Sequence, residues 1–297
     1  MGAAMLSVLL ASGVANGLLY GLIALGVVVL SKAANTFNFS QGDVMALGAF
    51  VSYTVVVTIG GEPVAAVPAV TLAALFVGLL SYLLLRSLMK SEHAVALLIA
   101  TIGLSFLIKG TIRLVWGGRG DYLAVPPLLT GPPLILFNGA IIVPLQYVAM
   151  MGGAILIILL FAIFFRFTRL GLFMRSVADN PRAAQIVGIP TQLVLCCAMV
   201  LSLIVSAIAG YLLAPATLIY PDMGFALFLK GFAAAIVGGM TSLPGAIVGG
   251  IILGVTEVLV SGYVSSQAQE LSAFVLIFIS LIFFPRGLFG GRASRSV

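Results

Sequence analysis

Ionised side chains are scarce in this chain. Asp, Glu, Lys and Arg together make up 7% of its 297 residues, whereas 62% are hydrophobic. Soluble domains carry roughly 25% charged residues, so this scarcity excludes an ordinary water-soluble fold. The mean hydropathy of +1.27 indicates that lipid surrounds most of the chain. The composition therefore predicts a polytopic membrane protein.

The residue types that carry most catalytic and metal chemistry are also nearly missing. There is one histidine, His93, and the two cysteines, Cys196 and Cys197, are adjacent within an apolar stretch. That spacing fits neither a structural disulfide nor a metal ligand set, and we expect His93 to be an interface residue. The patterns G-x-S-x-G and H-E-x-x-H and paired intramembrane carboxylates are absent, which argues against an intramembrane hydrolase. The sequence predicts no catalytic residue and no metal site.

No glycine is followed by a lysine anywhere in the sequence, so the phosphate-binding loop G-x-x-x-x-G-K-[ST] is absent. We therefore expect no ATP site of that kind and no bound cofactor, and any energy must come from elsewhere. The net charge of +6 does not indicate a nucleic-acid partner, because the basic residues gather at the ends of apolar spans. That placement is typical of the cytoplasmic loops of membrane proteins.

Apolar runs are abundant, and about 20 helical residues suffice to cross a bilayer. The first run has no charge before Lys32 and no basic start, so we expect a retained transmembrane helix rather than a cleaved signal. Residues 116–144 are rich in Gly and Pro and indicate an ordered loop on the outer side of the membrane. The sequence predicts an all-α polytopic transmembrane helix bundle with about eight membrane-embedded segments, in a single transmembrane domain over residues 1–297. The expected spans are 6–30, 44–59, 64–85, 94–114, 141–165 and 193–214, followed by apolar regions at 225–260 and 271–284.

The distribution of lysine and arginine predicts the orientation, because cytoplasmic loops are enriched in both. Ten basic residues lie inside if the N-terminus is outside, namely Lys32, Arg86, Lys90, Arg166, Arg169, Arg175, Arg182, Arg286, Arg292 and Arg295. Three lie outside, namely Lys109, Arg113 and Arg119, and Lys230 falls in a membrane region. An outside N-terminus and an inside C-terminus require an odd number of crossings. Region 225–260 must then return to the side that it left.

Region 225–260 is too long for one straight span, and the sequence GGMTSLPGA at 238–246 breaks it. We interpret it as two half-helices or two short crossings joined at membrane depth, and the alternative is one long tilted helix. Irregular backbone survives in a membrane only where protein or a water-filled cavity surrounds it, and discontinuous helices often mark a transport path. Path candidates here are Gly238, Gly239, Ser242 and Gly245.

Polar residues inside the apolar regions are further path candidates. In segment 33–48, Asn38, Ser40 and Gln41 belong either to a simple cytoplasmic loop or to a partly unwound stretch inside the bundle that lines a polar passage. Lys230 and Glu257 lie one in each arm of region 225–260. Our hypothesis is that Glu257 faces the translocation path or pairs within the bundle, and the alternative is an interfacial position for both.

Residues 166–190 form the longest polar interval of the chain. Apolar residues at helical spacing, possible caps at Ser176, Asp179 and Asn180, and Pro181 in a first turn predict one or two short amphipathic helices across the membrane face. The apolar positions are Phe173, Val177, Ala184 and Val187. The interval is either a solvated connector or a docking site for another protein. We favour docking, because small residues would let a partner approach closely, namely Gly171, Ala178, Ala183, Ala184 and Gly188.

Three stretches together resemble the branched-chain amino acid ABC transporter permeases of the LivH type. The first comprises NGLLYGLIALG at 16–26, NFSQGD at 38–43 and LGAF at 47–50. The family usually has N-F-A-H-G-E at the second of these, so Ser40, Gln41 and Asp43 are conservative departures. Residues 168–189 look like the family's EAA-type loop, although Arg182 stands where many members carry an acidic residue. Residues 221–257 look like its C-terminal signature.

The resemblance implies a permease of the bacterial inner membrane that carries branched-chain or related small amino acids inward. It further implies a second permease subunit, homologous or identical, an extracytoplasmic solute-binding protein, and two cytoplasmic ATP-binding subunits that hold ATP and Mg. Urea or short amides are alternative substrates. A secondary transporter or channel is the rival class, and a scaffold or membrane enzyme is more distant. The implied ATPase-coupling residues are Arg169, Gly171, Arg175, Asp179, Pro181, Ala183, Ala184 and Gly188.

Overall fold

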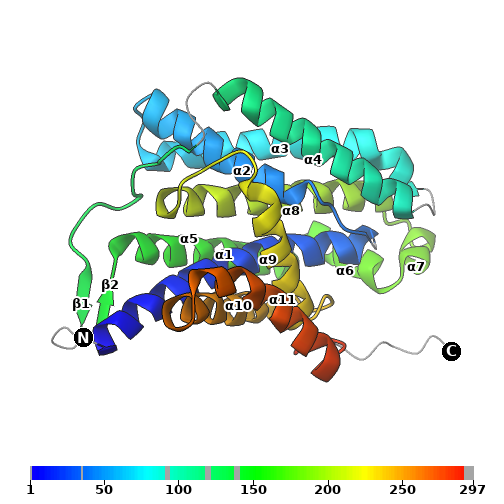
Figure 1. The fold of residues 1–297 in the computed structure, drawn as a ribbon. Coiled ribbons are helices and arrows are strands. Elements are labelled where there is room, and N and C mark those ends of the chain that lie inside the picture. The colour runs from blue at the N-terminus through cyan, green and yellow to red at the C-terminus, as the bar shows by residue number, and fades with distance from the viewer. Residues whose placement is uncertain (1, 35, 91–93, 118–121, 137–140, 291–297) are drawn as a thin grey trace.

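The computed structural model describes residues 2–34, 36–90, 94–117, 122–136 and 141–290, and most of them are helical (Figure 1). Within these ranges, eight helices are long and apolar enough to cross a membrane, which confirms the predicted all-α polytopic bundle. They are α1 (Gly2–Ala34), α2 (Gln41–Tyr53, continued by a π-helical turn Thr54–Thr58), α3 (Pro63–Lys90), α4 (Ala94–Trp116), α5 (Leu145–Phe167), α8 (Thr191–Leu213), α10 (Leu243–Tyr263) and α11 (Ser266–Phe283).

The core of the bundle is built around α1, whose residues from Leu18 to Leu30 are almost all buried. Helix α10 packs along α1 in the opposite direction. A Cβ added at Gly17 would lie 2.7 Å from the Cα of Ile251, and one added at Gly21 would lie 3.1 Å from the Cα of Ile247. Small residues let two helix backbones approach in this way, so α1 and α10 touch backbone to backbone.

The lipid-facing layer consists mainly of α3, α4, α5 and α11. Large apolar side chains stay exposed on all four, for example Phe76, Phe106, Leu159 and Phe278. Of the spanning helices, α5 and α11 are the least buried. Side chains that are exposed and uniformly apolar are expected where hydrocarbon is the solvent, so these helices form the periphery of the bundle.

Region 225–260 is divided into two helices, so the alternative of one long tilted helix is wrong. Helix α9 (Met223–Gly238) ends at Gly239, whose positive φ of 103° is a conformation that glycine adopts readily. Helix α10 starts after Ser242, whose hydroxyl accepts a hydrogen bond from the Gly245 N–H at 3.1 Å. In Figure 1, α9 lies steeply across the long helices rather than alongside them.

The chain beyond α11 returns to the end of α9. The backbone N–H groups of Leu288 and Phe289 donate to the carbonyls of Val237 and Gly238, at 2.9 and 3.0 Å. Carbonyls in the last turn of a helix have no partner within the helix, so this segment supplies partners that lipid could not. This contact was not predicted from the sequence.

Two small features mark the opposite ends of the bundle (Figure 1). Strands β1 (Leu134–Leu136) and β2 (Ile141–Val143) form an antiparallel hairpin beside the N-terminal helix, where the Ile142 N–H donates to Ser7 Oγ at 3.2 Å. Helices α6 (Arg169–Asp179) and α7 (Pro181–Ile186) lie at the other end. The hairpin was not predicted, and His93, Arg119, Arg292 and Arg295 lie outside the described residues.

Candidate functional site

A cavity of about 510 Å³ lies between α1, α9, α10, α11 and the segment that follows α8. Its polar lining includes Asn16, Tyr20, Lys230, Glu257, Gln269 and Glu270, with Thr217 and Tyr220. Its apolar lining includes Leu213, Phe225, Leu227, Phe274 and Ile277. The cavity therefore combines charged groups with a large apolar wall.

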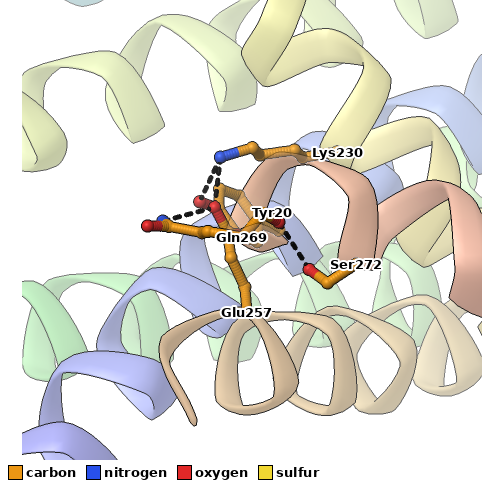
Figure 2. A network of polar contacts seen from close by, with 5 residues as sticks. All are labelled: Tyr20, Lys230, Glu257, Gln269 and Ser272. Carbon is orange, nitrogen blue, oxygen red and sulfur yellow. Dashed lines mark hydrogen bonds and ion pairs between the residues drawn. The ribbon is translucent and has the colours of Figure 1, made fainter. Parts of the chain in front are cut away.

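An ion pair between Lys230 of α9 and Glu257 of α10 forms the polar centre of the cavity (Figure 2). The side chains of Lys230 and Glu257 are 19% and 2% exposed. Gln269 of α11 donates from Nε2 to Glu257 Oε1 at 2.9 Å, and Lys230 Nζ lies 3.5 Å from the Tyr20 hydroxyl. The second carboxylate oxygen, Glu257 Oε2, has no hydrogen-bond partner among the described residues.

This ion pair joins the two arms of the interrupted region. A single charge within the membrane costs several kcal/mol, and pairing with an opposite charge offsets much of that cost. The structure pairs Lys230 with Glu257 inside the bundle, which was one of the hypotheses for Glu257. Tyr20 and Gln269 were not singled out from the sequence. Their signal was weak, because each is a single polar residue, Tyr20 within the apolar span 6–30 and Gln269 just before the apolar region 271–284.

A second group of charges connects α4 to α2 and α9. Asp43 is buried in the first turn of α2, accepts a short hydrogen bond from Ser105 Oγ, and lies 3.8 Å from Lys109 Nζ. One helical turn further along α4, Arg113 forms an exposed ion pair with Asp222 at 2.5 Å. Lys109 and Arg113 were counted as basic residues at the outer end of their span, and the structure pairs both with carboxylates. The predicted orientation is thus opposed by fewer free positive charges than the count suggested.

The predicted path residues Asn38, Ser40 and Gln41 are buried between helices. Asn38 Oδ1 accepts hydrogen bonds from the backbone N–H and hydroxyl of Ser40, at 3.0 and 2.7 Å. Gln41 donates to the Ile23 carbonyl at 2.8 Å and accepts from Ser202 Oγ at 3.1 Å. The described part of this segment lies inside the bundle and ties α1, α2 and α8 together, and these three residues do not line the cavity.

The predicted path residues at the break pack against each other. A Cβ on Gly238 would lie 1.9 Å from the carbonyl oxygen of Gly245, and Gly239 contacts the segment after α11. A second hollow of about 540 Å³ lies beside the break and includes Met240 and Arg286 in its lining. Neither Ser242 nor these three glycines line either space, so of the predicted path residues Glu257 alone lines the first cavity.

The polar interval 166–190 forms the two short helices α6 and α7, in agreement with the prediction. Asn180 Oδ1 accepts from the Ala183 N–H at 3.0 Å, and Pro181 occupies the first turn, both as expected. The cap of α6 is Thr168, whose hydroxyl accepts from the Gly171 N–H at 3.0 Å. Sequence reasoning missed this cap, although a threonine before a helix is a recognisable signal.

One face of the pair α6–α7 packs on the bundle and the other is exposed. Gly171 is buried because α6 crosses the end of α5, where an added Cβ would lie 2.6 Å from the Phe164 carbonyl oxygen. Val187 is 80% exposed rather than part of the apolar face, because α7 ends at Ile186 and Gly188 turns the chain with φ 85°. Of the predicted coupling residues, Gly171 and Ala184 are buried, and Arg169, Arg175, Asp179, Pro181, Ala183 and Gly188 are exposed.

Comparison with known proteins places the chain in a family. Residues 9–284 match the model of the branched-chain amino acid transport system permease component. The high-affinity branched-chain amino acid transport system permease protein LivH of Escherichia coli (strain K12) is 31% identical over 292 residues, 94% of each chain. BraD of Pseudomonas aeruginosa, a permease protein of the same description, is 27% identical over 295 residues, 95% of this chain and 94% of its own.

Among solved structures, PsaBC from Streptococcus pneumoniae in complex with Fab aligns with a TM-score of 0.49 and 14% identity, over 94% of this chain and 92% of that chain. That likeness is too weak to support an argument. The family model and the two relatives confirm the resemblance found in the motifs. The chain therefore belongs to the branched-chain amino acid ABC transporter permease family, and it is a multi-pass permease of the bacterial cytoplasmic membrane.

Proposed function

We propose that this permease carries branched-chain amino acids into the cell, driven by two cytoplasmic ATP-binding subunits that bind ATP and Mg. The full importer would also hold a second permease subunit and an external solute-binding protein. The assignment of the substrate is supported by LivH and BraD, which are both named as branched-chain amino acid transport permeases. The similarity to this chain extends over 94% of the length of each. The ATPases are supported by the missing phosphate-binding loop, since the chain needs a separate source of energy.

The exposed face of α6–α7 is the observation that supports this proposal most. It presents Arg175 and Asp179 of α6 and, at the end of α7, two apolar side chains, Ile186 and Val187, which are 86% and 80% exposed. Exposed apolar side chains together with charges, on a polar segment at one end of a membrane bundle, fit a protein partner better than water. This face is the proposed docking surface for the ATPases.

The packing of α6 offers a route from the ATPases to the cavity. Helix α6 contacts α1, α5 and α8, and α1 in turn forms one wall of the cavity through Asn16 and Tyr20. Closure of the two ATPases around ATP would displace α6–α7 and shift these helices. Such coupling needs two states of the bundle that differ in their contacts at the docking surface.

The hairpin end of the bundle is the proposed site for the solute-binding protein. It lies at the opposite end from α6–α7 and beside the N-terminus, which the basic residues place outside (Figure 1). Substrate released there would enter the bundle on the side away from the ATPases.

Purification of the importer with its candidate ATPases tests this arrangement. Ile186→Asp places a charge at the most exposed apolar side chain of the proposed docking surface, and we expect it to abolish co-purification of the ATPases. Ile135→Asp is the matched control, because Ile135 is 62% exposed on the hairpin at the other end. ATPase binding that survives Ile186→Asp, or that both variants abolish alike, would refute the docking assignment.

Uptake measurements separate the proposal from its rival. Proteoliposomes that contain the whole importer should accumulate L-leucine only with ATP and the binding protein present. If this chain alone moved leucine without ATP, it would be a secondary transporter or channel. If the complete importer moved urea or a short amide but no leucine, the substrate class would be wrong.

A further inference from the structure

We propose that the cavity beside the Lys230–Glu257 ion pair binds the transported amino acid as a zwitterion, with Lys230 holding its carboxylate and Glu257 its ammonium group. This inference rests on the proposed function and names the residues that recognise the substrate. It follows from the unused bonding capacity of the pair, from its charge balance and from the walls of the cavity.

Both charged groups keep bonding capacity for a ligand. Glu257 is 1% exposed, lines the cavity and leaves Oε2 without a hydrogen-bond partner among the described residues. A buried acceptor without a partner costs free energy, which a ligand ammonium would recover. Lys230 has three N–H donors and uses one on Glu257 and a long contact of 3.5 Å on Tyr20.

Charge balance favours a ligand with both charges. The pair is neutral overall, and a zwitterion is neutral too, so the two can lie side by side with each charge next to two opposite ones. An amine or a carboxylic acid alone would add a net charge to a site of low dielectric. The site should therefore reject both half-molecules of an amino acid.

The remaining walls suit an apolar side chain. Leu213, Phe225 and Phe274 line the cavity with other apolar residues, and its volume of about 510 Å³ lies within the roughly 300–1,000 Å³ usual for ligand sites. Helix α9, which forms one wall, is interrupted at Gly239, and discontinuous helices commonly flank the substrate sites of transporters. A leucine side chain would bury more apolar surface here than an alanine side chain would.

A cysteine reporter in the cavity makes binding measurable. Ala226 is exposed and lines the cavity, and Ala65 at the start of α3 is exposed but does not line it. Each is replaced by cysteine in the complete importer, after Cys196 and Cys197 have been replaced by serine, and the rate of maleimide labelling is measured in lipid nanodiscs. We expect L-leucine to slow labelling at position 226 and not at position 65.

Two half-molecules of leucine then identify the role of each charge. Isoamylamine lacks the carboxylate and 4-methylpentanoate lacks the amine. We expect both to protect position 226 at concentrations about 10-fold or more above that of leucine, the effect of losing a hydrogen bond to a charged group. In Lys230→Met, leucine should become no better than isoamylamine, and in Glu257→Gln no better than 4-methylpentanoate.

The result would differ if the ion pair only joined α9 to α10. Either substitution would then weaken protection by all three compounds by the same factor, and that result would overturn the proposal. Equal protection by leucine and its half-molecules in the parent protein would do the same. Lys230→Arg keeps the charge and should preserve the preference for leucine, which guards against a variant that merely fails to fold.

The outcomes also separate this inference from the proposed function. ATP-driven leucine uptake without protection at position 226 would overturn the cavity assignment and leave the importer intact. Absence of leucine uptake by the complete importer would overturn the proposed function itself.

Discussion

The backbone contact between α1 and α10 predicts opposite effects for the same substitution at different glycines. A Cβ at Gly250 would lie 2.5 Å from the Gly17 carbonyl oxygen and 2.5 Å from the Gly21 nitrogen. Both neighbours are backbone atoms, so a change of side-chain rotamer cannot relieve the clash. Gly250→Ala must therefore push two packed helices apart.

The size of the effect follows from the geometry. Ordinary contacts of a Cβ begin at 3.4 Å, so the helices must separate by roughly 0.9 Å (3.4 minus 2.5) at this point. A gap of about 0.5–1 Å forfeits about a quarter to a half of the dispersion energy of the contacts that it opens. Overpacking of this kind typically costs about 1–3 kcal/mol.

Glycines without close neighbours provide the control. A Cβ at Gly103 of α4 or Gly152 of α5 would meet nothing within 4 Å. A helix is more stable with alanine than with glycine by about 0.5–1 kcal/mol, because alanine loses less conformational freedom when the chain folds. Gly103→Ala and Gly152→Ala should therefore leave stability unchanged or raise it.

The assay is the thermal midpoint of the purified permease in one detergent. With about 2 °C per kcal/mol for a chain of this size, Gly250→Ala should lower the midpoint by about 2–6 °C. The control variants should not lower it. A midpoint for Gly250→Ala at or above that of the parent, or equal losses in all three variants, would show that α1 and α10 do not pack as the structure has them.

Further predictions concern the charged residues and one helix cap. Lys230→Met and Glu257→Leu should each lower the free energy of unfolding by about 3–5 kcal/mol, because each leaves a buried charge unpaired, whereas the double variant should be close to the parent in a chemical unfolding titration. Lys109→Met should lower the thermal midpoint, because its carboxylate partner is buried. Arg113→Gln, from an exposed pair, should change the midpoint by at most about 2 °C, the equivalent of about 0–1 kcal/mol. Asn180→Ala removes the cap of α7, which should cost about 1 kcal/mol and appear as faster amide hydrogen exchange over residues 182–186.

The features that the sequence predicted are local. Hydrophobic runs located the spanning helices, and the pair Gly238–Gly239 followed by Ser242 and Pro244 located the break between α9 and α10. Asn180 and Pro181 likewise predicted the start of α7. In each case a few neighbouring residues determine the backbone conformation, whatever the rest of the chain does.

The features that escaped prediction depend on contacts between distant segments. Lys230 and Glu257 are 27 residues apart, and Asp43 meets Ser105 across 62 residues, so no local pattern pairs them. The return of Leu288 to the end of α9 is of the same kind. The hairpin is a local feature, but its two strands of three residues are too short to stand out from other apolar runs.

The way in which the walls of the cavity are held indicates which of them can move. Backbone contact between Gly17 and Gly250 makes α1 and α10 a single rigid unit, since packed cores respond to force by switching rather than by bending. Helix α9 packs on that unit just as closely, since a Cβ at Gly249 would lie 2.2 Å from the Ala234 carbonyl oxygen, and the Lys230–Glu257 ion pair also links the two arms. Helix α11 is the less firmly held wall, because it is among the least buried of the spanning helices. A change of access should therefore move α11 against the unit of α1, α9 and α10, and with it Gln269, which donates to Glu257 Oε1. Loss of that donor would leave the buried carboxylate short of partners, and the ammonium group of a bound zwitterion would supply one.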